Sequence, residues 1–346
     1  MKPDSNPQNQ PQPDGSFGPE FMEKFQGVIK SYAEAITADQ TEEADRAAAA
    51  VLVMAAAEAI THPTPDLQVA EEAANSLRAG DWVRAEEAYR KLLTMQEQTG
   101  NPCLQAKPQM DLSRLFCLIG RLDEAWAFAR AATASARRTE LYPLMAMALE
   151  NEALCALARG DVLQALAAAS EAVQVIEPGK IADLMRAGAY TIRAECLLLT
   201  GDPDAAEKDL KAGWDILGSR KLSNLGTGPV ARLAKWREVQ AQMRVRKGRL
   251  EDAAAALRQA IEHRREGFNR SCDPSPYAFA ALARTFERLA EIMKKTGELQ
   301  AERQALAEAT TLWERAHLTT SGPKTIAIEG RNPNPECEPP YASPIG

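Results

Sequence analysis

Two stretches of sequence decide the fold, Gly120-Arg-Leu-Asp-Glu-Ala125 and Gly160-Asp-Val-Leu-Gln-Ala165. Each follows a run in which apolar residues recur at helical spacing, and each precedes a second such run. Glycine permits the left-handed backbone that ends a helix, and the acidic residues behind it suit the first turn of the next helix. Each stretch therefore predicts a helix, a tight turn and a second helix.

The same arrangement recurs along the chain. The turn glycines are separated by 40, 40, 41, 47 and 49 residues, and regular spacing in this range indicates a solenoid. An alanine stands five residues after each of the first five glycines, and a small residue stands seven residues before all six. Antiparallel helices approach closely where both present small side chains, so these positions predict helix crossings. The six turn glycines are Gly80, Gly120, Gly160, Gly201, Gly248 and Gly297.

The glycine turn, with its small residues on both sides, resembles the tetratricopeptide repeat (TPR) over roughly Asp66 to His317. Units of this length are similar to the long repeats of kinesin light chains and of the sensory domains of some bacterial regulators. The resemblance implies an all-α fold, a right-handed α-solenoid of stacked antiparallel helical pairs. HEAT and armadillo repeats have a similar length but lack this turn, so they rank second.

The domain organisation follows from where the repeat pattern begins and ends. Before the first unit, Asp39 stands where a turn glycine is expected, and in the sixth unit Glu302 replaces the alanine. Both termini are rich in proline and show no helical periodicity. We predict a disordered tail over 1–18, a TPR-like domain over 19–318 with a degenerate helical pair at 20–61 and six repeats at about 66–317, and a disordered Pro-rich tail over 319–346.

The composition limits the partners and the setting. The net charge is −7, which disfavours nucleic acid and anionic membranes, because both are bound through basic surfaces. The most apolar stretch, Ala47 to Ala57, is far shorter than the ~20 residues that a membrane span needs. The beginning of the sequence has no apolar core of the kind a signal peptide carries. We therefore expect a cytoplasmic protein that binds neither nucleic acid nor membrane.

No motif in the sequence predicts a catalytic, cofactor or metal site. The six cysteines form no C-x-x-C pair and the three histidines stand alone, so no zinc-ligand spacing can be assembled. Gly226-Thr-Gly228 lacks the strand and the further glycines of a phosphate loop. Cys155 and Cys196 both stand five residues before a turn glycine, and we interpret them as free thiols that fill a packing position.

These observations favour a non-catalytic interaction protein. We expect a scaffold or adaptor that binds a protein, as a peptide or helical segment, in the groove of the solenoid. The alternative is a regulatory sensor that binds a small peptide or effector and controls a separate partner. An enzyme ranks third, because no nucleophile, base and orienting group can be assembled. The sequence leaves the partner's identity and the oligomeric state open.

The resemblance also implies which residues line the groove. In TPR proteins, residues 13, 10, 9 and 6 positions before the turn glycine tend to face the concave surface. Of the residues carried over, only Arg114 and Asn151 match the family's clamp for peptide carboxylates, and acidic residues accumulate toward the C-terminal half. The candidate groove residues are Lys107, Arg114, Glu150, Asn151, Thr191, Glu195, Glu238, Gln242, Glu287 and Glu291.

Two interpretations of this acidic face stay open. It is either a solvated helix face or a groove whose acidic end prefers a basic or amphipathic segment. On the second interpretation, reversing Glu195 and Glu238 to lysine weakens binding and leaves thermal stability unchanged.

Overall fold

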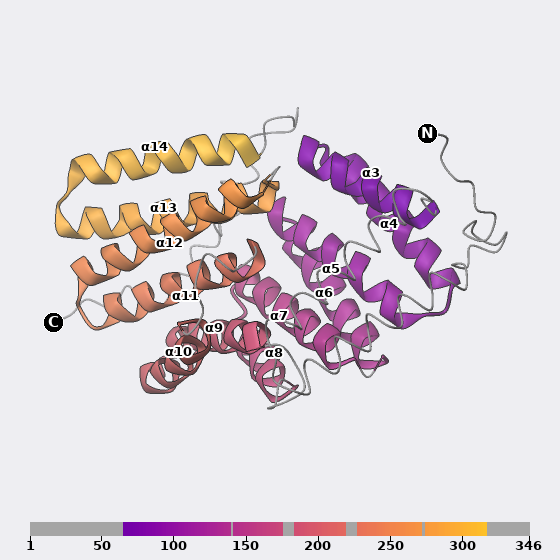
Figure 1. The fold of residues 1–346 in the computed structure, drawn as a ribbon, viewed down its shortest axis with the longest axis horizontal. Helices are drawn as coiled ribbons and strands as arrows, with labels where there is room; N and C mark the ends of the chain where they lie inside the picture. The colour runs from indigo at the N-terminus through magenta and orange to yellow at the C-terminus, as the bar shows by residue number, and fades with distance from the viewer. Residues whose placement is uncertain (1–64, 140, 176–182, 219–226, 272–273, 317–346) are drawn as a thin grey trace, which may run out of the picture. The chain divides into compact units, whose positions relative to one another are not determined.

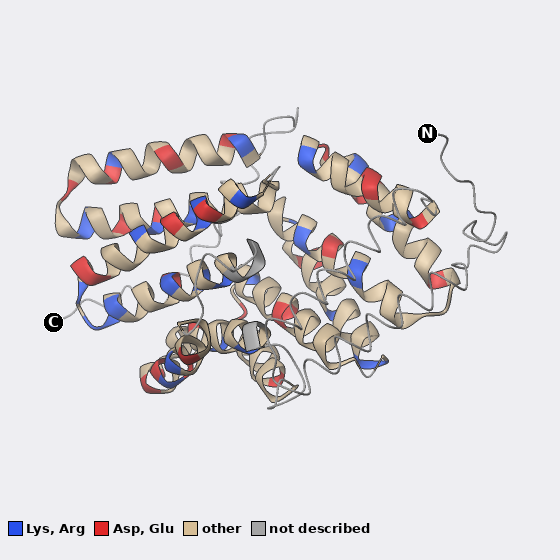
Figure 2. Ribbon diagram, in the orientation of Figure 1, with Lys and Arg blue, Asp and Glu red and all other residues tan. Residues whose placement is uncertain are grey.

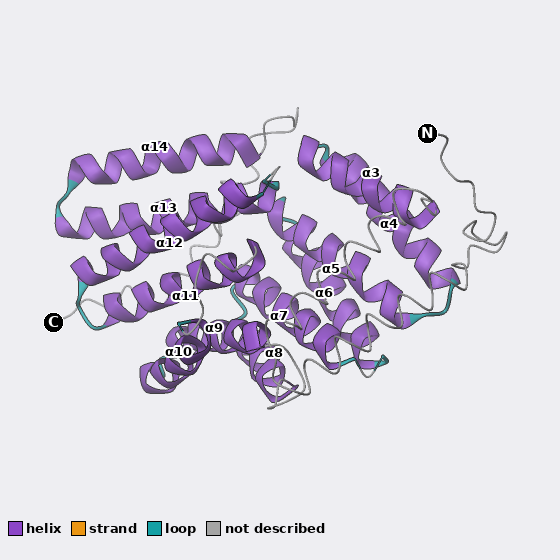
Figure 3. Ribbon diagram, viewed as in Figure 1, coloured by secondary structure: helices purple, strands orange, loops and turns teal. Residues whose placement is uncertain are grey.

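The structure is a computed structural model that describes residues 65–139, 141–175, 183–218, 227–271 and 274–316. Across these ranges the chain forms twelve α-helices and no strand (Figures 1 and 3). The helices are α3 (Pro65–Ala79), α4 (Trp82–Gln98), α5 (Pro102–Leu118), α6 (Leu122–Arg137), α7 (Tyr142–Arg159), α8 (Val162–Val175), α9 (Asp183–Thr200), α10 (Pro203–Leu217), α11 (Thr227–Arg246), α12 (Leu250–Arg270), α13 (Pro276–Thr296) and α14 (Leu299–Ala316).

The chain divides into two compact units, Met1–Glu72 and Ala73–Gly346. Of the first unit the structure describes the beginning of α3, and the account below concerns the second. The predicted tails at 1–18 and 319–346, and the degenerate pair at 20–61, lie outside the described residues and stay predictions.

The turn glycines end the first helix of each pair as the sequence predicts. All six have a positive φ, between 71° and 89°, which a residue with a Cβ adopts only at a cost. The amide after the glycine then donates to a carbonyl five residues back. Asp161 N donates to Ala156 O and Asp202 N to Leu197 O, each at 2.9 Å. These bonds satisfy carbonyls that the end of a helix leaves free.

The predicted crossing points are packed. The alanines five residues after the first five turn glycines are 0% exposed, and the small residues seven before all six are at most 2% exposed. Helix pairs α5/α6, α7/α8, α9/α10, α11/α12 and α13/α14 pack together (Figure 1). The fold class is therefore confirmed as an all-α solenoid of helical pairs.

The first helices of successive pairs also pack on one another. Contacts join α5 to α7, α7 to α9 and α9 to α11, so side chains on these helices meet across repeat boundaries. We call the side on which they meet the first-helix face, and it carries the candidate site. None of the helices in the described ranges is both long and apolar enough to cross a membrane.

Candidate functional site

The first-helix face carries a network of charged side chains built around three buried carboxylates. Glu150 on α7, Glu195 on α9 and Glu238 on α11 are 8%, 4% and 5% exposed. Burying an ionised carboxylate is costly unless cations and hydrogen bonds compensate it. Each of the three has such partners, and most of them come from other helices.

Glu238 has the most partners. Arg264 Nη2 lies 2.6 Å from Glu238 Oε1, and the Thr285 hydroxyl donates to the same oxygen at 2.7 Å. Arg288 Nη1 lies 3.2 Å from Oε2. These contacts connect α11 with α12 and α13.

Glu195 is held in a similar way. Lys235 Nζ lies 2.6 Å from its Oε2, and Gln242 Nε2 donates to Oε1 at 3.2 Å. Arg288 Nη2 lies 3.5 Å from Oε1. Because Arg288 contacts both Glu195 and Glu238, one guanidinium on α13 connects the carboxylates of α9 and α11.

Glu150 forms an ion pair that passes over a neighbouring helix. Arg232 on α11 places Nη1 3.0 Å from Glu150 Oε1 on α7, and α9 lies between them in chain order. Gly188 on α9 makes the contact possible, because a Cβ there would lie 1.6 Å from Arg232 Nη1 and 2.8 Å from Glu150 Oε1. The glycine therefore leaves room for the ion pair.

The surrounding charges set the acidity of these carboxyls. Burial alone would raise the pKa of Glu238, but Arg264, Arg288 and Lys235 outweigh it and lower the pKa to about 2. The balance is the same at Glu195, where Lys235 and Arg288 outweigh burial and lower the pKa. For Glu150 burial outweighs Arg232, and the pKa is raised. Glu195 and Glu238 are therefore charged near neutral pH.

Two polar groups extend this network toward the N-terminal repeats. Arg114 Nε on α5 donates to Asn151 Oδ1 on α7 at 3.3 Å, and Asn151 Nδ2 donates to Ser113 Oγ at 2.6 Å. Next to them, the sulfur atoms of Cys117 on α5 and Cys155 on α7 lie 3.4 Å apart. The α5/α7 contact is thus polar as well as apolar.

Arg284 on α13 is the cation of this face with the least compensation. Its side chain is exposed, and no ion pair or hydrogen bond joins it to any described residue, although its guanidinium carbon lies 5.6 Å from the centre of the Trp313 ring. The surrounding protein partly desolvates the guanidinium and lowers its pKa; the nearby Cys117 and Glu287 raise the pKa, whereas Arg288 and Arg264 lower it. A side chain that reaches water while other cations crowd it is suited to take up an anionic group.

The polar network as a whole carries excess positive charge. It has six cations and three carboxylates, which are named at the end of this paragraph. Two further carboxylates, Glu287 and Glu291, border it, and the cations still outnumber the carboxylates when these two are included. The chain as a whole is negative, at −7, and Figure 2 shows both signs spread along the helices. The six cations of the network are Arg114, Arg232, Lys235, Arg264, Arg284 and Arg288, and its three carboxylates are Glu150, Glu195 and Glu238.

Both interpretations of the acidic face are therefore wrong for its central residues. Glu150, Glu195 and Glu238 are neither solvated nor free to attract a basic segment, because arginine and lysine side chains already neutralise them. Reversing Glu195 and Glu238 to lysine would place cations against Lys235 and Arg288 and would destabilise the fold.

The structure brings some of the candidate groove residues together and leaves others apart. Arg114, Glu150, Asn151, Glu195, Glu238 and Gln242 belong to the network described above. Lys107 pairs with Asp111 on its own helix, and the Thr191 hydroxyl donates to Ala187 O at 2.7 Å. Glu287 accepts from Trp313 Nε1 of α14 at 3.0 Å, and Glu291 is exposed.

The sequence identified Arg114 but not the other five cations of the network. Lys235 and Arg284 stand 13 residues before their turn glycines and Arg288 stands nine before, so the positions used for the other candidates would have found them. Arg232 and Arg264 lie outside those positions, and Arg264 is on a second helix. Nothing in the repeat pattern marks these two.

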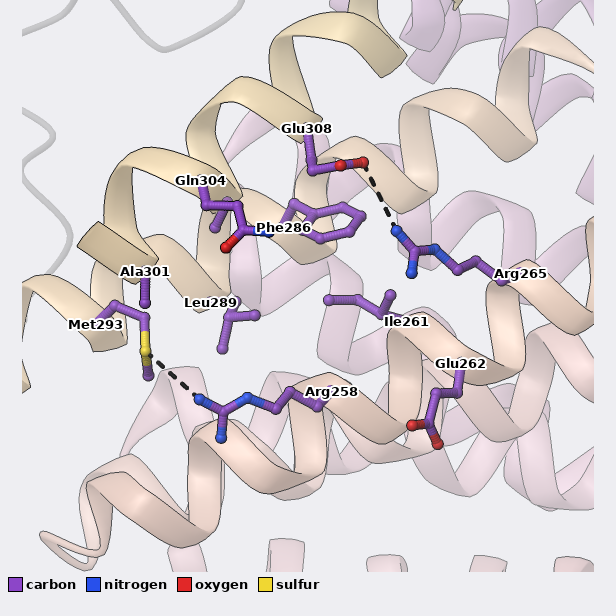
Figure 4. Close-up of a pocket in the computed structure, with 11 residues that line it drawn as sticks. Arg258, Ile261, Glu262, Arg265, Phe286, Leu289, Met293, Ala301, Gln304 and Glu308 are labelled. Carbon is purple, nitrogen blue, oxygen red and sulfur yellow. Dashed lines mark hydrogen bonds and ion pairs between the residues drawn. The ribbon is translucent and has the colours of Figure 1, made fainter. Parts of the chain in front are cut away.

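A separate pocket lies between α12, α13 and α14 (Figure 4). Its volume is about 390 Å³, its apolar side chains include Phe286 and Leu289, and Arg265 and Glu308 form an ion pair of 3.6 Å beside it. It contains none of the candidate groove residues. Within the described ranges, no group of three or more His, Cys, Asp or Glu side chains could hold a metal ion.

The geometry defines the class: a helical-repeat solenoid with a polar network on the face where its first helices meet. No protein-family model matches the sequence, and no curated protein matches it. Solved structures do. A Rap protein complexed with competence and sporulation factor is 12% identical with a TM-score of 0.50, and the match covers 86% of this chain and 99% of that one.

Two further structures are similar. RapI without a ligand is 12% identical with a TM-score of 0.50, over 73% of this chain and 98% of that one. The putative kinesin light chain repeats of Podosopora anserina, described as TPR-like, are 15% identical with a TM-score of 0.40, over 63% and 98%. The chain has the TPR-like repeat fold.

Proposed function

We propose that this chain is a non-catalytic interaction scaffold whose first-helix face binds a protein or peptide segment that carries carboxylates. The observation that carries the proposal is Arg284, an exposed cation with no ion-pair partner among the described residues. Arg114 is exposed on the same face, and its guanidinium donates to Asn151 Oδ1 at 3.3 Å but forms no ion pair with a described residue. Arginine suits this role because its planar guanidinium binds a carboxylate through two parallel hydrogen bonds.

The charge balance supports an acidic rather than a basic ligand. The buried glutamates are already paired, so a basic segment would have to compete with arginines that the fold holds in place. An acidic segment meets exposed arginines that form no ion pair with a described residue, and complementary charge speeds association and selects the partner.

A sensor is the second candidate, and Arg288 favours it. Its guanidinium contacts Glu195 and Glu238 on two different helices. A ligand carboxylate that competes for Arg288 would loosen contacts between α9, α11 and α13, and binding would be coupled to helix packing. The Rap structure similar to this chain contains a bound factor, which agrees with either candidate.

Selection from a random peptide library displayed on phage tests the proposal. We expect the enriched peptides to be rich in Asp and Glu, and their binding to weaken as salt is added, because salt screens exposed charges. As a control, the same selection on an Arg114→Glu, Arg284→Glu double variant should lose that preference. Enrichment of basic peptides, or equal enrichment by both proteins, would contradict the proposal.

A further inference from the structure

Two thiols from neighbouring repeats lie in contact, Cys117 on α5 and Cys155 on α7. Their sulfur atoms are 3.4 Å apart, and the S–S bond of a disulfide is about 2.05 Å long, so the two sulfurs are in contact and must move closer for the bond to form. Cys155 is 2% exposed, whereas Cys117 is half-buried. Among the described residues, Cys103 and Cys196 are free cysteines with no contact to another sulfur.

Packing alone does not account for the residue at position 117. The equivalent position, three residues before the turn glycine, is aliphatic in four of the other five repeats, where it is Leu77, Leu157, Leu198 and Val245, and is Lys294 in the fifth. A cysteine there is smaller than the residue at this position in any of the other repeats. It also places its sulfur against the sulfur of the next repeat.

The two thiols differ in acidity. The hydrogen bond between the two thiols lowers the pKa of Cys117, and the positive charge of Arg284 lowers it further, although burial opposes both. The same hydrogen bond and burial raise the pKa of Cys155. The half-buried sulfur is therefore the better nucleophile, because the thiolate is the reactive form, and the buried one stays protonated beside it.

We propose that Cys117 and Cys155 are an oxidation site, a dithiol that a hydroperoxide converts into a disulfide linking α5 to α7. The Cys117 thiolate attacks the peroxide, the O–O bond breaks, and the leaving alkoxide takes a proton to become an alcohol, or water when the oxidant is hydrogen peroxide. Cys117 is then a sulfenic acid. The Cys155 sulfur attacks it, the S–O bond breaks, and the hydroxyl leaves as water with the Cys155 proton. The thiols lose two electrons and the peroxide gains two.

The disulfide would join two helices that contact each other across a repeat boundary. It closes a loop from residue 117 to residue 155 and so restricts the unfolded chain. We expect the oxidised protein to melt several degrees higher than the reduced protein. Since the oxidised site has no thiolate, it also leaves Arg284 without one of the negative charges that act on it.

Peptide mapping of the full chain after oxidation tests the proposal directly. The protein is treated with hydrogen peroxide, the remaining thiols are alkylated, and a tryptic digest is read by mass spectrometry. Trypsin releases Cys117 in residues 115–121 and Cys155 in residues 139–159. We expect these two peptides to appear cross-linked, with the loss of two hydrogens, and to separate again when dithiothreitol is added.

Three variants complete the test. Cys117→Ser and Cys155→Ser should each abolish the cross-link and the rise in melting temperature, whereas Cys196→Ser should keep both. The peptide map of the wild-type protein tests the proposal even if one of the variants does not fold. A wild-type map in which both cysteines remain alkylated, or in which Cys117 reaches a sulfinic acid while Cys155 stays reduced, would overturn the proposal. None of these results depends on peptide binding.

Discussion

Replacing Gly188 with alanine should break the ion pair that passes over α9. The new Cβ would lie 1.6 Å from Arg232 Nη1 and 2.8 Å from Arg232 Cζ and Glu150 Oε1. The end of an arginine side chain is flexible, so we expect the guanidinium to move aside and the backbone to stay in place. Glu150 then remains buried without its cation.

The magnitude follows from three contributions. Breaking a buried ion pair costs about 3–5 kcal/mol. The Arg232 side chain is 26% exposed, so water can take over part of its solvation, and alanine is favoured over glycine inside a helix by about 1 kcal/mol. We expect a net loss of about 2 kcal/mol near neutral pH, which lowers the melting temperature by roughly 4–8 °C.

The pH dependence identifies the cause. Burial already raises the pKa of Glu150, and loss of Arg232 raises it further. A carboxyl whose folded-state pKa is raised disfavours folding above that pKa, and protonation relieves the cost as the pH falls. The destabilisation should therefore be large near pH ~7 and smaller near pH ~4, which is close to the pKa of an unperturbed glutamate.

Thermal melts followed by circular dichroism measure the effect, with Gly213→Ala as the matched control. A Cβ at Gly213 would meet Trp236 Cδ1 at 3.4 Å and Ala187 O at 3.5 Å, which are ordinary contacts, so the control should be neutral or slightly stabilising. If Gly188→Ala melted at the wild-type temperature near neutral pH, or lost the same stability at both pH values, the ion pair would not have the role assigned to it.

Two further predictions concern the fold. Ala165 is 0% exposed at a helix crossing, so Ala165→Leu should lower the free energy of unfolding by ~1–3 kcal/mol through overpacking. The control Leu163→Ala, at a 73% exposed position, should be close to neutral. An unchanged urea midpoint for Ala165→Leu would mean that the helices cross elsewhere. The pKa of Glu238 is lowered to about 2 in the folded protein, so this carboxylate stabilises the fold at pH values above its unfolded pKa. That stabilisation, about 3 kcal/mol in all, is lost as the pH falls toward 2. The stability of Glu238→Gln should not show this loss when the protein is titrated with acid, and an equal loss in both proteins would contradict the prediction.

The fold could be predicted from the sequence because its determinants are local. A turn glycine and the small residues on either side of it fix one helical pair, whatever the rest of the chain does. Gly160 and Ala165 illustrate this, since the left-handed turn and the buried crossing are both set within six residues.

The candidate site could be predicted only in part, because its geometry depends on how repeats stack. Position in the repeat placed Glu195 and Glu238 in one group, and Arg288 contacts both. It did not show that both are buried, because their compensating cations come from other helices, such as Arg264 on α12. Cys117 and Cys155 stand at different positions in their repeats, three and five residues before the glycine, and only the packing of α5 on α7 reveals that they meet.

The account's central claim is that Arg284, a cation with no ion-pair partner among the described residues, binds an acidic ligand on the first-helix face, and one affinity comparison tests it most directly. An acidic peptide from the library is titrated into wild-type protein, Arg284→Ala and the control Arg249→Ala. The Arg249 side chain precedes α12, is 62% exposed and pairs with Asp252 in the first turn of that helix. Hydrogen bonds to charged groups contribute about 1.5–3 kcal/mol. The account predicts that Arg284→Ala weakens binding by about 10- to 100-fold with little change in melting temperature, and that Arg249→Ala binds like the wild type. Equal affinity for Arg284→Ala and the wild type would contradict it.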